Sequence, residues 1–212
     1  GDKQAIKNID LVQKYINHIE SGNSARTLES NDEDLSLINS FNLLTMKPVL
    51  YVCNVDEGSV LKGNNYVKSI QEATKNENAE VLIIATAIEA EIADLDTIDE
   101  QLLFLDEMGL DQPGVNHLIK STYKLLNLQT YFTAGEKEVK AWTIVKGTKA
   151  PKAASVIHTD FEKGFIRAEV ISYDNFIKYG SEHNCRENGK LSIEGKDYVV
   201  NDGDIMHFRF NV

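Results

Sequence analysis

Two polar side chains follow a short apolar segment in a pattern that suits recognition of a purine base. Residues 49–53 (Val-Leu-Tyr-Val-Cys) are continuously apolar and rich in β-branched and aromatic residues, which is typical of a buried strand in a parallel sheet. Asn54 and Glu57 come directly after this segment. An Asn amide can donate to purine N7 and accept from an exocyclic amine, and a carboxylate accepts from ring N–H or amine groups. The alternative is an ordinary polar loop.

A second apolar segment adds to this interpretation. Residues 80–85 (Glu-Val-Leu-Ile-Ile-Ala) read as another buried strand, and Thr86 and Ala87 follow it. A helix predicted over 66–75 separates the two strands, so we expect a parallel pair joined by a right-handed crossover. Ligands of open α/β sheets bind just outside the carboxyl ends of the strands. Because small residues let backbone N–H groups approach a flat ligand, the two strand ends are predicted to form one crevice.

A second candidate site is a stretch of basic and aromatic residues in the last third of the chain. Exposed aromatic rings could stack on bases there, while lysines contact phosphates. The alternative is a core hairpin with a solvated rim of lysines, and the sequence leaves both open. The stretch comprises Lys137, Lys140, Lys146, Lys149 and Lys152, with Tyr131, Phe132 and Trp142.

Other groupings of reactive side chains favour structural roles. Ser155, His158 and Asp160 have the residue types of a catalytic triad, but neighbouring residues of a helix point in different directions. We therefore expect a structural or RNA-facing role for His158 and no catalytic residue in this chain. Cys53 falls in a predicted strand and Cys185 in a predicted surface loop, which gives no disulfide framework.

No metal site is predicted. The acidic residues between 89 and 100 have the spacing of a solvated helix face, without convergent oxygen ligands. The turn at 202–204 (Asp-Gly-Asp) resembles the start of a calcium loop but lacks the Glu that an EF-hand carries at its twelfth position. No pair of His or Cys residues has the spacing of zinc ligands.

Composition and charge indicate a globular protein with two different surfaces. The chain has 212 residues, of which 42% are hydrophobic and 26% charged, and its net charge is −11. Residues 1–126 carry 10 basic and 21 acidic side chains, whereas residues 127–212 carry 12 of each. The acidic total argues against an indiscriminate nucleic-acid binder. No membrane-spanning segment or signal peptide is predicted. Because the two cysteines suggest no disulfide framework, we expect a cytoplasmic protein in a reducing environment.

Hydrophobic periodicity predicts helices first, then an α/β segment, then short strands. Residues 1–44 read as two amphipathic helices around a polar loop at 24–33, with an apolar face that runs from Ile6 to Ile19. Because the chain opens in helix-like sequence, we expect a segment to precede Gly1. Further helices are predicted at 89–95, 99–108 and 115–126.

The last part of the chain is predicted to fold around one helix. Two hairpin strands come first, then a helix, then more strands, which suggests a mixed sheet that grips the helix in a β-grasp arrangement. The predicted strands cover 129–133, 139–145, 166–172, 190–193, 198–200 and 205–210. The predicted helices cover 149–161 and 173–179, and 181–189 is predicted to be a polar loop.

Three long stretches together resemble the Obg-like ATPase (YchF) family of P-loop proteins. They are 43–57 (LLTMKPVLYVCNVDE), 125–144 (LLNLQTYFTAGEKEVKAWTI) and 157–168 (IHTDFEKGFIRA), and they occur in the order of the family. The resemblance covers essentially the whole chain. It implies an α/β fold: a helical arm at 1–44, part of a P-loop NTPase parallel sheet at 45–126, and an α+β β-grasp (TGS) domain at 127–212.

The resemblance also implies site residues and partners. Asn54, Val55 and Glu57 match the base-recognition motif N-x-x-E, a variant of the N-K-x-D of GTPases that is associated with ATP preference. Thr86 and Ala87 match the loop whose backbone contacts the base. The family implies an ATP hydrolase with weak GTPase activity, using ATP or GTP with magnesium. Its TGS domain implies that the protein binds the ribosome, either the large subunit or the whole particle, and RNA. The resemblance also implies a role in regulating translation and a monomeric protein.

One departure from the family limits this expectation. The phosphate loop G-x-x-x-x-G-K-[ST], which cradles phosphates and holds Mg²⁺, is absent from the sequence. Base contacts alone should bind weakly, because one bidentate base contact contributes only about 1–3 kcal/mol of discrimination. These 212 residues are therefore expected to hold no nucleotide tightly and to hydrolyse none unaided. The alternative function is a non-catalytic adaptor that binds ribosomes or RNA.

Overall fold

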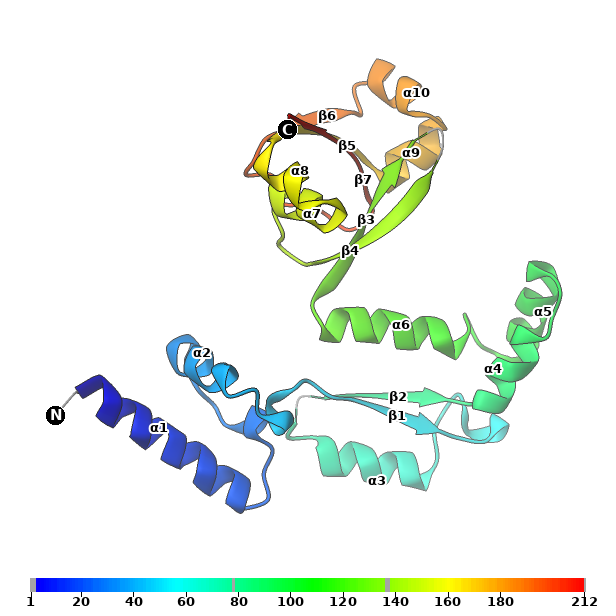
Figure 1. Ribbon diagram of the computed structural model, residues 1–212. Helices are drawn as coiled ribbons and strands as arrows, with labels where there is room; N and C mark the ends of the chain where they lie inside the picture. Colours follow the sequence, from blue (N-terminus) through cyan, green and yellow to red (C-terminus); the bar gives the residue numbers. More distant parts are fainter. Residues whose placement is uncertain (1–2, 78, 136–137, 212) are drawn as a thin grey trace. The chain divides into compact units, whose positions relative to one another are not determined.

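The protein divides into two compact units, Gly1–Leu125 and Leu126–Val212. A computed structural model describes residues 3–77, 79–135 and 138–211 (Figure 1). The first unit is a helical arm followed by a parallel strand pair, and the second is a mixed sheet wrapped around a helix. The second unit begins at Leu126, one residue before the boundary predicted from the sequence.

The helical arm folds on a small core of its own. It consists of α1 (Lys3–Glu20), the 3-10 turn η1 (Ala25–Thr27), α2 (Asp32–Ser40) and the 3-10 turn η2 (Leu44–Met46). Asn31 caps α2 by accepting from the Asp34 N–H. Leu11, Tyr15, Ala25 and Ile38 are buried together.

The apolar face predicted for α1 is only partly buried. Ile6, Ile9, Ile16 and Ile19 stay exposed, with Ile9 at 66%. The small core of the arm therefore buries Leu11 and Tyr15 of this apolar face and leaves its four isoleucines exposed to solvent.

An ion pair ties the arm to the strands of the same unit. Arg26 of η1 pairs with Glu77 and donates from Nη1 to the Thr45 carbonyl at 3.2 Å. Tyr51 of the first strand donates its hydroxyl to the same Glu77 carboxylate at 2.9 Å. One carboxylate thus joins the arm, the first strand and the segment that follows the crossover helix.

The parallel strand pair forms as the apolar segments predict. β1 (Leu50–Asn54) and β2 (Glu80–Ile84) align so that Asn54 lies opposite Ile84. The crossover passes through the 3-10 turn η3 (Glu57–Ser59) and α3 (Asn65–Thr74), whose first turn is capped by the Asn64 side chain. Both strands therefore end at the same edge, where the candidate base site was predicted.

Three helices complete the first unit: α4 (Thr86–Ala93), α5 (Ile98–Met108) and α6 (Gly114–Leu125). Helices α3 and α6 pack against the strand pair from either side (Figure 1). Helix α5 begins at a capping box between Thr97 and Glu100 and ends at Gly109 with φ +69°.

The start of α6 is capped by a side chain of α4. Glu89 of α4 accepts from the backbone N–H groups of Gly114 (2.7 Å) and Val115 (3.0 Å) at the start of α6. Glu89 therefore departs from the solvated face predicted for the acidic residues at 89–100.

The second unit is a five-stranded mixed sheet with the order β4-β3-β7-β5-β6. Strands β3 and β7 are parallel, whereas β3–β4, β5–β7 and β5–β6 are antiparallel. This order, with a helix between the second and third strands, is the β-grasp arrangement predicted from the sequence. The strands are β3 (Leu128–Ala134), β4 (Val139–Val145), β5 (Phe165–Ser172), β6 (Ser192–Glu194) and β7 (Asp204–Phe210).

Helix α7 (Ala150–Ile157) packs on one face of this sheet. Alternate residues of a strand point to opposite faces. Ala168 and Val170 of β5 and Phe208 of β7 share a buried cluster with α7, so the residues between them lie on the other face. The remaining helices are α8 (Thr159–Lys163), α9 (Tyr173–Tyr179) and α10 (Glu182–Glu187).

Three local predictions in this unit are wrong. The helix predicted over 149–161 breaks at His158, which caps α8 by accepting at Nδ1 from the Asp160 N–H. The predicted loop at 181–189 contains α10, capped by Ser181, and buries Cys185 completely. The strand predicted at 198–200 forms only an isolated bridge from Val199 to Lys149.

Candidate functional site

Asn54 is fixed in place by the residue that begins α4. The backbone N–H and the hydroxyl of Thr86 both donate to Asn54 Oδ1, at 3.0 and 3.1 Å. A carbonyl oxygen has two lone pairs, and both are used here. The predicted two-way contact, in which Asn54 also accepts from an exocyclic amine, is therefore incompatible with this arrangement. Asn54 instead presents its amide N–H₂ as a donor at an exposed position.

The turn after Asn54 places a carboxylate at the same strand end. Asp56 accepts from the Ser59 hydroxyl at 2.9 and 3.1 Å, which stabilises the start of η3. Glu57 is the first residue of η3, and its side chain is exposed. Val55 is half-buried and packs against the cluster beneath α4, so only part of its surface faces outward.

Thr86 and Ala87 form the first turn of α4 and are both exposed. The contact with Thr86 joins the ends of β1 and β2 directly, because the Val55 N–H also donates to the Ile84 carbonyl at 2.8 Å. The structure thus brings Asn54 and Thr86 together and leaves Glu57 and Ala87 accessible on the neighbouring turns.

The predicted lysine surface is partly neutralised within the second unit. Lys149 pairs with Asp197 at 2.7 Å and Lys152 with Glu162 at 3.0 Å. The ammonium of Lys140 lies 4.2 Å from the centre of the Trp142 ring, whereas Lys146 is exposed. Lys137 lies outside the described residues.

The aromatic residues of the same stretch have structural partners. Tyr131 is fully buried and donates its hydroxyl to the Ala153 carbonyl at 2.9 Å, so it cannot stack on a base. Burial also raises the pKa of Tyr131. The indole N–H of the half-buried Trp142 donates to the Thr133 hydroxyl at 2.9 Å. For Tyr131 and Trp142 the core-hairpin alternative describes the structure better than base stacking does.

An arginine cluster that sequence reasoning missed lies on the sheet face opposite α7. Arg167, Arg186 and Arg209 all contact the buried carboxylate of Glu169. They come from β5, α10 and β7, so no local sequence pattern could have shown that they meet. The only available signal was period-two alternation, which places residues 167 and 169 on one face of a strand.

The described residues offer no candidate metal site or membrane helix. Within 3–77, 79–135 and 138–211, no three His, Cys, Asp or Glu side chains converge as metal ligands would. Across the same residues, every helix is too short or too polar to cross a bilayer. Asp204 of the suspected calcium turn instead accepts from the Tyr198 hydroxyl at 2.7 Å and the Asn201 N–H at 2.8 Å.

Comparison with known proteins places the chain in a family. Residues 128–211 match the YchF-GTPase_C family model, described as "Protein of unknown function (DUF933)". The "Ribosome-binding ATPase YchF" of Pasteurella multocida is 50% identical over all 212 residues. The chain belongs to the YchF family. The Bacillus subtilis YchF is 47% identical over the whole chain.

A solved YchF structure supports the same assignment. The "Schizosaccharomyces pombe YchF GTPase" matches 98% of this chain with a TM-score of 0.85 and 34% identity. The chain covers 58% of the Pasteurella and Bacillus YchF sequences and 55% of the S. pombe structure. The α/β fold predicted from the sequence is thereby confirmed.

Proposed function

We propose that this chain supplies the base-recognition and ribosome-binding portion of a cytoplasmic, ATP-preferring YchF ATPase. The observation that carries the proposal is the Asn54–Thr86 contact, which fixes an amide donor at the carboxyl ends of two parallel strands. This contact occurs in a chain that shares 50% sequence identity with a protein named a ribosome-binding ATPase. That name supports ribosome association and nucleotide hydrolysis here.

Each residue of the strand ends has a distinct role in this proposal. The Asn54 amide donates to N7 of adenine, and the Glu57 carboxylate accepts from its exocyclic amine. Guanine would instead offer two donors, N1–H and N2, which suit the Asp of N-K-x-D motifs. Val55 and Ala87 give apolar contact to the ring, and Thr86 acts through Asn54 by holding its oxygen.

The phosphates and Mg²⁺ have no matching residues in this sequence, since no G-x-x-x-x-G-K-[ST] occurs among the 212 residues. When bound, Mg²⁺ would neutralise charge on the phosphates. The proposed contribution of this chain is therefore orientation of the base, with magnesium–nucleotide chemistry belonging to the complete gene product.

The experiment compares nucleotide affinity in the complete gene product. Asn54→Ala and Glu57→Ala should each weaken binding of a fluorescent ATP analogue about tenfold, because each removes a base contact of roughly 1–3 kcal/mol. Glu91→Ala, on the exposed face of α4, is the matched control and should bind ATP normally. Unchanged affinity in both test variants would refute the base-recognition role.

The second candidate is a non-catalytic adaptor that binds the ribosome through its β-grasp unit, which we assign as a TGS domain. The exposed guanidinium groups of Arg167, Arg186 and Arg209 in this unit favour it. Ribosome co-sedimentation of the 212-residue chain without nucleotide would support this function. A requirement for ATP in that assay would favour the ATPase switch.

A further inference from the structure

The second unit carries a buried carboxylate that is surrounded by three arginines. Glu169 has only 7% of its side chain exposed. Arg209 donates to it from Nε and Nη2, each at 3.3 Å, and Arg186 donates from Nη2 at 3.3 Å. Arg167 lies 3.7 Å away. The hydrogen bonds from Arg209 hold the pKa of Glu169 below its usual value, so the carboxylate is ionised at neutral pH.

Electrostatic repulsion among the arginines would by itself destabilise the folded unit. Arg167 and Arg209 are direct partners in the β5–β7 register, and His207 lies opposite Glu169. Like charges directly opposite one another on a sheet are destabilising. Glu169 offsets part of this repulsion, and Glu182 adds a contact to Arg186 at 3.1 Å. Three guanidinium groups against these two carboxylates leave one positive charge in excess.

The guanidinium groups remain available to a ligand. The side chains of Arg167, Arg186 and Arg209 are 49%, 56% and 47% exposed. Each guanidinium has five N–H donors, of which Glu169 and Glu182 occupy only a part. A planar fork of donors suits bidentate binding of phosphate, and its fixed orientation reduces the entropy lost on binding.

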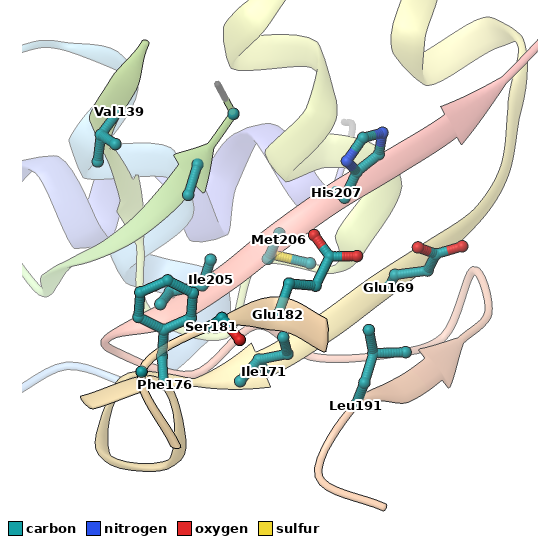
Figure 2. Close-up of a pocket in the computed structure, with 13 residues that line it drawn as sticks. Val139, Glu169, Ile171, Phe176, Ser181, Glu182, Leu191, Ile205, Met206 and His207 are labelled. Atoms are coloured by element: carbon teal, nitrogen blue, oxygen red, sulfur yellow. The ribbon is translucent and has the colours of Figure 1, made fainter. Parts of the chain in front are cut away.

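A pocket of about 340 Å³ is lined in part by Glu169, the residue that contacts all three arginines (Figure 2). Ile171, Phe176, Leu191 and Ile205 supply apolar side chains from the sheet, α9 and the segment before β6. Glu169, Glu182 and His207 also line it, and both carboxylates contact Arg186. A concave, mostly apolar site with a few polar groups at its edge is typical of a ligand pocket.

We propose that the arginine cluster and this pocket together bind single-stranded RNA. Phosphates lie on the exposed guanidinium groups, and one unstacked base enters the apolar pocket. Proteins that read RNA by sequence take up splayed bases of loops in this way, whereas duplex bases stay stacked and inaccessible. The identity of the partner rests on the proposed ribosome association, but the site lies entirely within the second unit.

The test measures binding of the 212-residue chain to a fluorescent single-stranded oligoribonucleotide across a range of salt concentrations. The double variant Arg167→Gln/Arg186→Gln should bind about tenfold more weakly. The slope of log affinity against log salt concentration should be smaller in magnitude by about 1.4, the value for two phosphate contacts on a single strand. Arg209 is kept so that Glu169 retains its bidentate partner.

Two further variants separate the parts of the proposal. Lys163→Gln/Lys196→Gln removes the same charge from exposed lysines of the same unit that do not line the pocket, and should leave affinity nearly unchanged. Leu191→Trp, which fills the pocket, should weaken single-strand binding without changing the salt slope. Thermal unfolding followed by far-UV circular dichroism checks that each variant is folded.

Several outcomes would overturn the proposal. These are equal losses in the arginine and lysine variants, equal affinity for a duplex of the same sequence, or binding of an acidic peptide in place of RNA. Ribosome co-sedimentation distinguishes failure of the proposed RNA site from failure of the proposed ribosome association. If the arginine variant still pellets with ribosomes as the parent chain does, the RNA site is refuted while ribosome association stands.

Discussion

At the residue scale, the buried carboxylate of Glu169 should make the second unit sensitive to acid. Hydrogen bonds from Arg209 lower its pKa in the folded state. Its contribution to stability is therefore present above the unfolded-state pKa of about 4.3 and is lost as pH falls through the lower folded value. Glu169→Gln should lower the unfolding free energy at pH 7 by about 2 kcal/mol. Denaturant unfolding followed by Trp142 fluorescence measures it.

The control for this prediction is Glu182→Gln, whose side chain is 45% exposed and which contacts only one of the three arginines. Its effect should stay below about 1 kcal/mol, the range of exposed ion pairs. The difference between Glu169→Gln and the parent should also shrink below about pH 4. A difference that persisted at low pH would show that packing, and not charge, is what Glu169 supplies.

Thr86 offers a second residue-scale prediction. Thr86→Val removes the hydroxyl bond to Asn54 but keeps the backbone bond, so the amide should be held less firmly. ATP affinity of the complete gene product should fall about threefold, the usual effect of one hydrogen bond. Thr86→Ser keeps the hydroxyl and should bind ATP normally. Equal affinity in both variants would mean that the backbone bond alone orients Asn54.

At the element scale, Glu89 should control the stability of α6. Its carboxylate accepts from two N–H groups of the first turn, and Gly114 lies so close that a Cβ there would meet Glu89 Oε1 at 2.9 Å. Glu89→Ala should destabilise this end of α6 by about 1 kcal/mol. Amide hydrogen exchange of α6 should then be about fivefold faster, while exposed Glu91→Ala should leave it unchanged.

Most elements could be predicted from the sequence because apolar periodicity dominates them. The strands at β1 and β2 and the hairpin of β3 and β4 appear within one or two residues of their predicted bounds. Helix α10 could not be predicted, since it is short and polar and is stabilised by its Ser181 cap and the tertiary contact of Arg186. The break at His158 could not be predicted either, because the His158 side chain caps α8 through a hydrogen bond that is seen only in the structure.

At the scale of the whole molecule, sites differ in how far sequence can predict them. Asn54 and Glu57 could be named as candidates because they are close in sequence and follow a recognisable strand, and their role in base binding stays a prediction. That Thr86 occupies the Asn54 oxygen depends on the register of two strands, which no local pattern contains. The arginine cluster likewise exists only after β5, β7 and α10 assemble, whereas the lysines close in sequence are partly paired.

The last prediction concerns catalysis by the whole chain. Gly58 and Gly63 have the spacing of a phosphate loop, but Asn64 and Asn65 follow in place of Lys and Ser or Thr. Asn64 also accepts from the N–H groups of Tyr66 and Val67, at 3.0 and 3.1 Å. It thereby occupies donors at the start of α3 that a phosphate would need.

Phosphate release from saturating magnesium–ATP should therefore stay at the buffer rate for the 212-residue chain, because its proposed role is to orient the base and its sequence has no phosphate loop to bind the transferred group. The complete gene product serves as the positive control and should hydrolyse ATP under the same conditions. Asn54→Ala in the 212-residue chain identifies the source of any turnover. Turnover by this chain that disappears in Asn54→Ala would mean that these residues contain a complete catalytic site, contrary to the proposed division of roles.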